Sequence, residues 1–165
     1  MNATRFLLGA LALLAISCAQ ESPTASSERV VEAGSSFGFC IGPCRSELRL
    51  SGETLALRVT DRTGSEVIAQ NRGRLTSRGA SRLAGLSASL PDDLLEQYGC
   101  PDCADGGASW VTVARESGTR RTEYEYGKPP SELAAMDEFL AGLIQALREC
   151  RETSDVTLVS GCTPT

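Results

Sequence analysis

The sequence contains no histidine, and this absence excludes several kinds of chemistry. Ser-His-Asp and Cys-His catalysis, imidazole metal ligands and imidazole pH switches all need that side chain. Lysine is almost as scarce, because Lys128 is the single one. It does not complete a Ser-x-x-Lys motif, the order in which a lysine acts as base for a serine nucleophile. These absences favour a non-enzymatic protein, and we predict no catalytic residue and no cofactor.

Positive charge and aromatic side chains are also in short supply. Lys and Arg number 16 against 21 Asp and Glu, for a formal net charge of −5, and aromatic residues make up 5%. An acidic chain without a long basic block is a poor partner for nucleic acid, whose phosphates need concentrated positive charge. The length of 165 residues suits one domain of ordinary size.

The chain has no apolar run long enough to span a bilayer; its longest, residues 6–16 after Arg5, is typical of an export signal. Residues 15–18, Ala-Ile-Ser-Cys, resemble a bacterial lipobox, where signal peptidase cuts before a cysteine that is then lipidated. Ordinary cleavage after Ala19 is the alternative. We therefore predict a signal peptide over 1–17, a lipidated Cys18 with a flexible tether over 18–35, and a single domain over 36–165.

The predicted signal peptide and lipidation site imply an envelope protein whose soluble domain lies outside the cytoplasm. The membrane partner would be reached through the lipid on Cys18, and an envelope protein or glycan is the other expected partner. In a Gram-negative cell, Ala19 after the lipidated cysteine favours the outer membrane, by resemblance to known sorting signals.

Seven cysteines cannot all pair, so a lipidated Cys18 leaves an even number for disulfides. Six cysteines formally allow about 15 connectivities. We predict the local one, which joins Cys40 to Cys44, Cys100 to Cys103, and Cys150 to Cys162. The last bond would hold the segment 155–159 against the preceding helix.

Hydrophobic periodicity predicts an α+β domain in which hairpins build an antiparallel sheet, with a long C-terminal helix and one or two shorter helices packed on one face. Apolar residues alternate through 48–59 across a turn at 51–53, a weaker strand follows at 67–75, and strands at 109–116 and 120–126 flank a Ser-Gly turn. Helical spacing appears at 80–90, and a strong apolar stripe runs through 133–147.

Several short motifs add a resemblance. The segment 39–44, Phe-Cys-Ile-Gly-Pro-Cys, comes directly before a hairpin, and residues 104–108 and 126–133 precede a strand and the last helix. Together they resemble an uncharacterised family of bacterial envelope domains with a Cys-x-Gly-x-Cys hairpin. The resemblance implies a small exported α+β domain and transfers no activity or catalytic residue.

Two alternatives use the cysteines chemically. Cys100-Pro-Asp-Cys103 has the spacing of a redox dithiol, although a turn rather than a helix is expected after it and Asp102 would oppose thiolate formation. Cys40, Cys44, Cys100 and Cys103 also have spacings that a structural zinc site accepts. In an exported protein disulfide formation competes with both, so we predict structural disulfides and no metal.

Two further clusters could bind a ligand. Arg72, Arg74, Arg78 and Arg82 are candidate anion-binding residues, against the alternative of a solvated arginine surface. Trp110, Tyr124 and Tyr126 lie on one expected hairpin and could stack on a sugar or peptide, although core packing is the commoner use of such residues.

Overall fold

The computed structural model describes residues 29–115 and 118–162, which form an α+β domain with an eight-stranded sheet and two α-helices. The sheet order is β5-β7-β6-β1-β2-β3-β4-β8. The strands are β1 (Arg29–Ser36), β2 (Arg45–Ser51), β3 (Thr54–Thr60), β4 (Val67–Leu75), β5 (Gln97–Tyr98), β6 (Ala108–Arg115), β7 (Gly118–Glu125) and β8 (Val156–Ser160); the helices are α1 (Ser77–Ala88) and α2 (Ala134–Arg148). A 3-10 turn, η1, covers Cys103–Asp105.

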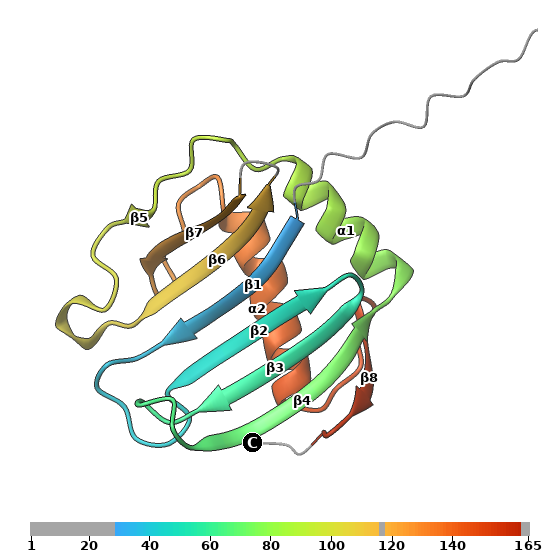
Figure 1. Ribbon diagram of the computed structural model, residues 1–165, viewed down its shortest axis with the longest axis horizontal. Coiled ribbons are helices and arrows are strands. Elements are labelled where there is room, and N and C mark those ends of the chain that lie inside the picture. Colours follow the sequence, from blue (N-terminus) through green and yellow to red (C-terminus); the bar gives the residue numbers. More distant parts are fainter. Residues whose placement is uncertain (1–28, 116–117, 163–165) are drawn as a thin grey trace, which may run out of the picture.

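Both helices pack against the same face of the sheet, and no helix of the described residues covers the other, open face (Figure 1). The core lies between the helices and the sheet because one side of each element is apolar. From the sheet come Leu48, Leu55, Leu57 and Val59, and from α2 come Met136, Phe139, Leu140, Leu143 and Leu147. Thr76 caps α1 by accepting a hydrogen bond from the backbone N–H of Gly79 at 3.1 Å.

The α+β class predicted from the sequence is confirmed, and the finer arrangement is corrected in two places. The sheet is mixed rather than antiparallel, because the short strand β5 pairs in parallel with β7. The long helix α2 is not the last element: β8 follows it and pairs with β4 at the edge of the sheet. The segment 155–159, expected to lie against the helix, mostly belongs to this strand.

The predicted tether also needs correction. Its residues 29–35 belong to β1, which lies between β2 and β6 near the middle of the sheet. Val30 and Ala33 are buried there, so apolar burial and two sets of strand hydrogen bonds stabilise a segment that looks polar in the sequence. The signal peptide, Cys18 and the rest of the tether lie outside the described residues. Within the described residues, no helix is both long and apolar enough to cross a membrane.

Candidate functional site: a groove between α2 and the sheet

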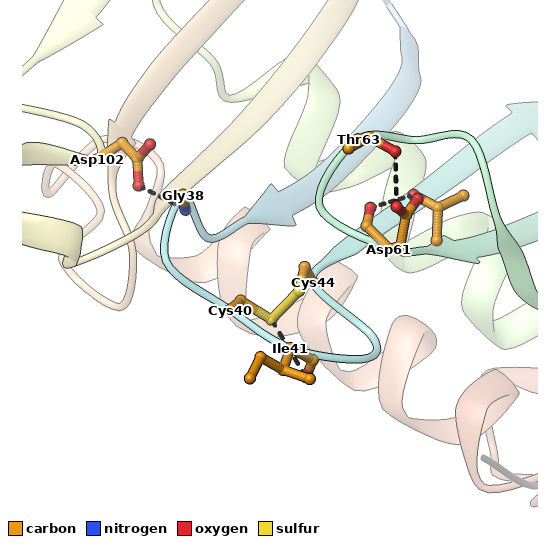
Figure 2. The surroundings of a disulfide bond; sticks show 8 residues. Gly38, Cys40, Ile41, Cys44, Asp61, Thr63 and Asp102 are labelled. Atoms are coloured by element: carbon orange, nitrogen blue, oxygen red, sulfur yellow. Dashed lines mark hydrogen bonds between the residues drawn. A yellow bond between two sulfur atoms is a disulfide. The ribbon is translucent and has the colours of Figure 1, made fainter.

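The six cysteines of the domain form the three predicted disulfides, joining Cys40 to Cys44, Cys100 to Cys103 and Cys150 to Cys162. The first closes the loop between β1 and β2 (Figure 2). The second closes the loop that leads to β6, and the third joins the end of α2 to the end of β8. The first two bonds therefore constrain loops between strands, and the third holds the end of β8 close to the end of α2.

The surroundings of Cys100 and Cys103 differ from those of a helix-activated dithiol. The pair follows the two-residue strand β5 and precedes η1, a three-residue turn, so no α-helix begins there to stabilise a thiolate. Both residues are exposed at the surface. For the zinc alternative, the four cysteines are divided between two separate disulfides, and no group of three or more metal-ligating side chains occurs among residues 29–115 and 118–162.

The four candidate anion-binding arginines do not form one site. Arg78 and Arg82 lie on α1 and are taken up by ion pairs with Asp155, with N–O distances of 3.7 and 3.2 Å. Arg72 and Arg74 lie on β4, pair across the ladder with Ala56 and Thr54, and point away from the helices. The expected cluster is thus split between two surfaces.

Trp110 and Tyr124 also lie on opposite sides of the sheet. Trp110 is paired with Gly34 and Glu123 in the ladder, whereas Tyr124 is paired with Ser109, one position along. Because successive side chains of a strand point to opposite faces, this register separates the two rings. The predicted aromatic trio therefore does not share a binding surface.

On the open face, Trp110 is covered by a network of charged side chains. The guanidinium groups of Arg45 and Arg121 both lie over its ring, 4.7 and 4.3 Å from the ring centroid. Its Nε1–H donates to Glu32 at 3.0 Å. Glu32, Glu47 and Glu123 then pair with Arg45, Arg49 and Arg121, so Trp110 is only 1% exposed although no helix covers it.

On the helix side, a row of hydroxyl side chains crosses four neighbouring strands. In the ladder Ser46 of β2 is opposite Ser35 of β1, Ser35 is opposite Ser109 of β6, and Ser109 is opposite Tyr124 of β7. Cross-strand partners point to the same face, and the Tyr124 hydroxyl reaches Asp137 of α2. With about 4.8 Å between strands, the row is about 14 Å long.

This row forms one wall of a groove whose other wall is α2. The groove has a volume of about 540 Å³, within the usual range of about 300–1,000 Å³ for small-molecule sites. Asp137, Ala141, Ile144 and Arg148 line it from the helix at spacings of three and four, so they form one helical stripe. The space remains open because the facing side chains, Ala33, the serines and Ala141, are small.

Two serines of this row are buried residues whose hydroxyls have no partner in the described chain. Ser46 is 4% exposed and Ser109 is 6% exposed, both line the groove, and neither hydroxyl forms a hydrogen bond with any residue in 29–115 or 118–162. Neither Oγ atom is among the fully buried side-chain atoms that lack a partner, so both reach the space inside the groove, where water or a ligand can complete their hydrogen bonds. The groove therefore offers hydrogen-bonding groups that the described chain leaves free for a ligand.

The two ends of the groove carry opposite charges. At one end the Tyr124 hydroxyl donates to Asp137 Oδ1 at 2.6 Å. Burial, strengthened by this bond to a carboxylate, raises the pKa of Tyr124, so it stays a neutral donor. At the other end Arg148 lines the groove and forms no ion pair with any described residue.

Two disulfide-closed loops continue directly into strands that line the groove. The loop 37–44 joins the β1 and β2 ends that carry Ser35 and Ser46, and the loop 99–107 leads into Ser109. Asp102, between Cys100 and Cys103, accepts the backbone N–H of Gly38 at 3.1 Å and ties the two loops together (Figure 2). Phe37 contacts Tyr126, a groove residue, at 4.7 Å between ring centroids. These contacts fix the rim.

Sequence reasoning missed this groove. Its serines come from three strands, and no local motif marks any of them; only the ladder brings them into one row. Tyr124 and Tyr126 were singled out, and both do line the groove. No protein-family model, curated protein or solved structure matches this chain.

Proposed function

We propose that this protein is a non-enzymatic ligand-binding module of the bacterial envelope, anchored by a lipid on Cys18, whose ligand lies in the groove between α2 and the sheet. The observation that carries the proposal is that the hydroxyls of Ser46 and Ser109 face the groove and have no partner in the described chain. Such groups are common in binding sites, where the ligand completes their hydrogen bonds.

The structural use of the cysteines supports a binding role. Two of the three disulfides close loops that continue into groove-lining strands, and the third links the end of α2 to β8. A groove with a fixed rim binds with a smaller loss of conformational entropy than a flexible one. In the exported location that the signal sequence predicts, such bonds are stable.

A groove-filling substitution tests the proposal. Ala141 is exposed, lies on α2 and lines the groove, so Ala141→Trp should fill the space without disturbing the core. The matched control is Ala135→Trp, on an exposed position of the same helix outside the groove. A panel of oligopeptides and oligosaccharides should contain compounds that raise the melting temperature of the native protein and of Ala135→Trp but not of Ala141→Trp. The proposal fails if no compound shows this dependence.

The second candidate is a thiol–disulfide oxidoreductase, and the observation in its favour is the exposure of both Cys100 and Cys103. An exposed disulfide is open to attack by an external thiolate. Insulin reduction should then require both cysteines, so Cys100→Ser with Cys103→Ser would abolish it while Cys40→Ser with Cys44→Ser would not. Under the binding proposal, neither protein reduces insulin.

A further inference from the structure

We propose, resting on the binding function above, that the groove holds a short extended peptide of about four residues, with its free amino terminus at Asp137 and its free carboxylate at Arg148. The walls of the groove restrict the length of the ligand, the two ends restrict its charges, and the middle restricts its hydrogen-bonding groups. Together they favour a linear molecule with opposite charges at its ends.

The length of the groove matches an extended chain of this size. The hydroxyl row from Tyr124 to Ser46 crosses three strand spacings, or about 14 Å. On the facing wall, Asp137 and Arg148 are separated by about 16 Å along the helix. An extended peptide advances about 3.3–3.6 Å per residue, so four residues, or at most five, span this distance.

At the Asp137 end, the carboxylate is positioned to receive an ammonium group. Its Oδ1 atom accepts the Tyr124 hydroxyl, and both residues line the groove. No basic side chain forms an ion pair with Asp137 among the described residues. A ligand ammonium would therefore supply the missing positive charge.

At the other end, Arg148 is positioned to receive a carboxylate. Glu149 also lines this end, but the Gln145 amide donates to it at 2.8 Å and Arg151 donates to it at 3.2 Å. Arg148 is half-buried and has no acidic partner in the described chain. A guanidinium in this position binds a planar carboxylate well, because its paired N–H groups match the two oxygens.

The middle of the groove suits a peptide backbone. A serine hydroxyl both donates and accepts, so Ser35, Ser46 and Ser109 can each bond to either an N–H or a C=O group of an extended chain. Leu140 and Ile144 supply apolar contact from the helix for small side chains. A neutral oligosaccharide could use the hydroxyls but would leave the charges at both ends without a partner, which is why we favour the peptide.

The test measures the affinity of tetra-alanine with free ends and of its carboxamide by titration calorimetry. The native protein should bind the free peptide at least about fivefold more tightly than the carboxamide, since one charge pair contributes roughly 1 kcal/mol. In Arg148→Gln this preference should disappear. The matched control is Arg72→Gln, which removes an equally unpaired arginine from the opposite face and should keep the full preference.

Different outcomes overturn different claims. If native protein does not bind the free peptide, or does not prefer it over the carboxamide, the peptide assignment is wrong. If a neutral oligosaccharide binds instead and Ala141→Trp abolishes that binding, the binding function stands and only the ligand class is overturned. If Ala141→Trp changes the binding of no probe at all, the groove is not a binding site and both proposals fail.

Discussion

The two faces of the sheet differ in whether their polar side chains have partners within the chain. On the open face, charged residues cover Trp110 and pair with one another, so the polar groups there have partners within the chain. On the helix-covered face, Ser46 and Ser109 are buried in a groove and find none among the described residues. These polar groups of the open face are therefore paired within the chain, whereas these two serine hydroxyls of the covered face are left for water or a ligand.

This difference suggests different roles for the two sets of polar residues: one set stabilises the fold and the other is available for binding. The charged network stabilises the fold by burying a large aromatic ring where no helix is available to cover it. Ser35, Ser46 and Ser109 of the hydroxyl row do nothing comparable, because a hydroxyl without a partner in the chain contributes no intramolecular hydrogen bond to stability. A chain selected only for stability would carry apolar residues in that row, as it does at neighbouring core positions such as Leu48 and Val111.

The largest effect is expected for Trp110→Ala on the open face. The substitution removes a buried ring and the contacts that Glu32, Arg45 and Arg121 make with it, so the free energy of unfolding should fall by about 3–5 kcal/mol. Urea denaturation measures it. The control is Tyr126→Ala, half exposed, which should cost clearly less. A loss below about 1 kcal/mol at Trp110 would mean that the network does not stabilise the fold.

Gly34→Ala should come next, because Trp110 lies over this glycine. A Cβ atom at position 34 would clash with the Ser46 carbonyl oxygen and with the Trp110 ring. The carbonyl belongs to the backbone and cannot move aside easily, so we expect a loss of about 1–3 kcal/mol. Gly85→Ala on α1 meets nothing within 4 Å and should instead stabilise the helix by up to about 1 kcal/mol. Equal effects at the two glycines would contradict the packing described.

Tyr124→Phe tests the one hydroxyl of the row that has a partner. The variant leaves Asp137 without its hydrogen bond. Its free energy of unfolding at neutral pH should therefore be about 1–2 kcal/mol lower than that of the native protein.

The same variant should change the pH dependence of stability. The native protein keeps the Tyr124 proton above the ordinary tyrosine pKa of about 10, while the unfolded chain loses it. The stability due to this group is therefore complete below about pH 10 and falls as pH rises further, by up to about 1.4 kcal/mol per pH unit. The free energy of unfolding of Tyr124→Phe should decline less steeply above pH 10 than that of the native protein. Identical slopes for the two proteins would show that Tyr124 is not a buried phenol with a raised pKa.

The smallest effect on stability is expected for Ser46→Ala combined with Ser109→Ala. Neither hydroxyl has a partner to lose in the described chain, so the free energy of unfolding should stay within about 0.5 kcal/mol of the native value. Ligand affinity should nevertheless fall. A loss of more than about 2 kcal/mol in urea would show that the hydroxyls serve the fold, and that the two faces do not differ as described.

The sequence predicts the parts of this fold that depend on local patterns. Alternating leucines marked β2 and β3, the apolar stripe marked α2, and short spacings marked the three cysteine pairs. The strand β1 was assigned to the tether because its apolar residues are few and mixed with glycine and serine, and it is held by partners far along the chain. β5 and β8 depend on long-range pairing in the same way.

The candidate site depends on register, which local patterns do not specify. Trp110 and Tyr124 were expected on one surface, yet a shift of one residue in the ladder places them on opposite faces. The serines of the hydroxyl row cannot be recognised from the sequence, because Ser35, Ser46 and Ser109 are ordinary polar residues in their own segments. Only the pairing of β2, β1 and β6 brings them together. Arg148 likewise gains its role only from the strands that α2 crosses.

The most direct test of the difference between the two faces is to record backbone amide chemical shifts while titrating tetra-alanine with free ends into the native domain. Shift changes should concentrate at Ser35, Ser46, Ser109, Ala141 and Arg148, and the amides of Glu32, Arg45 and Arg121 should change little. Changes concentrated around Trp110 on the open face, or none at the groove residues, would contradict the account.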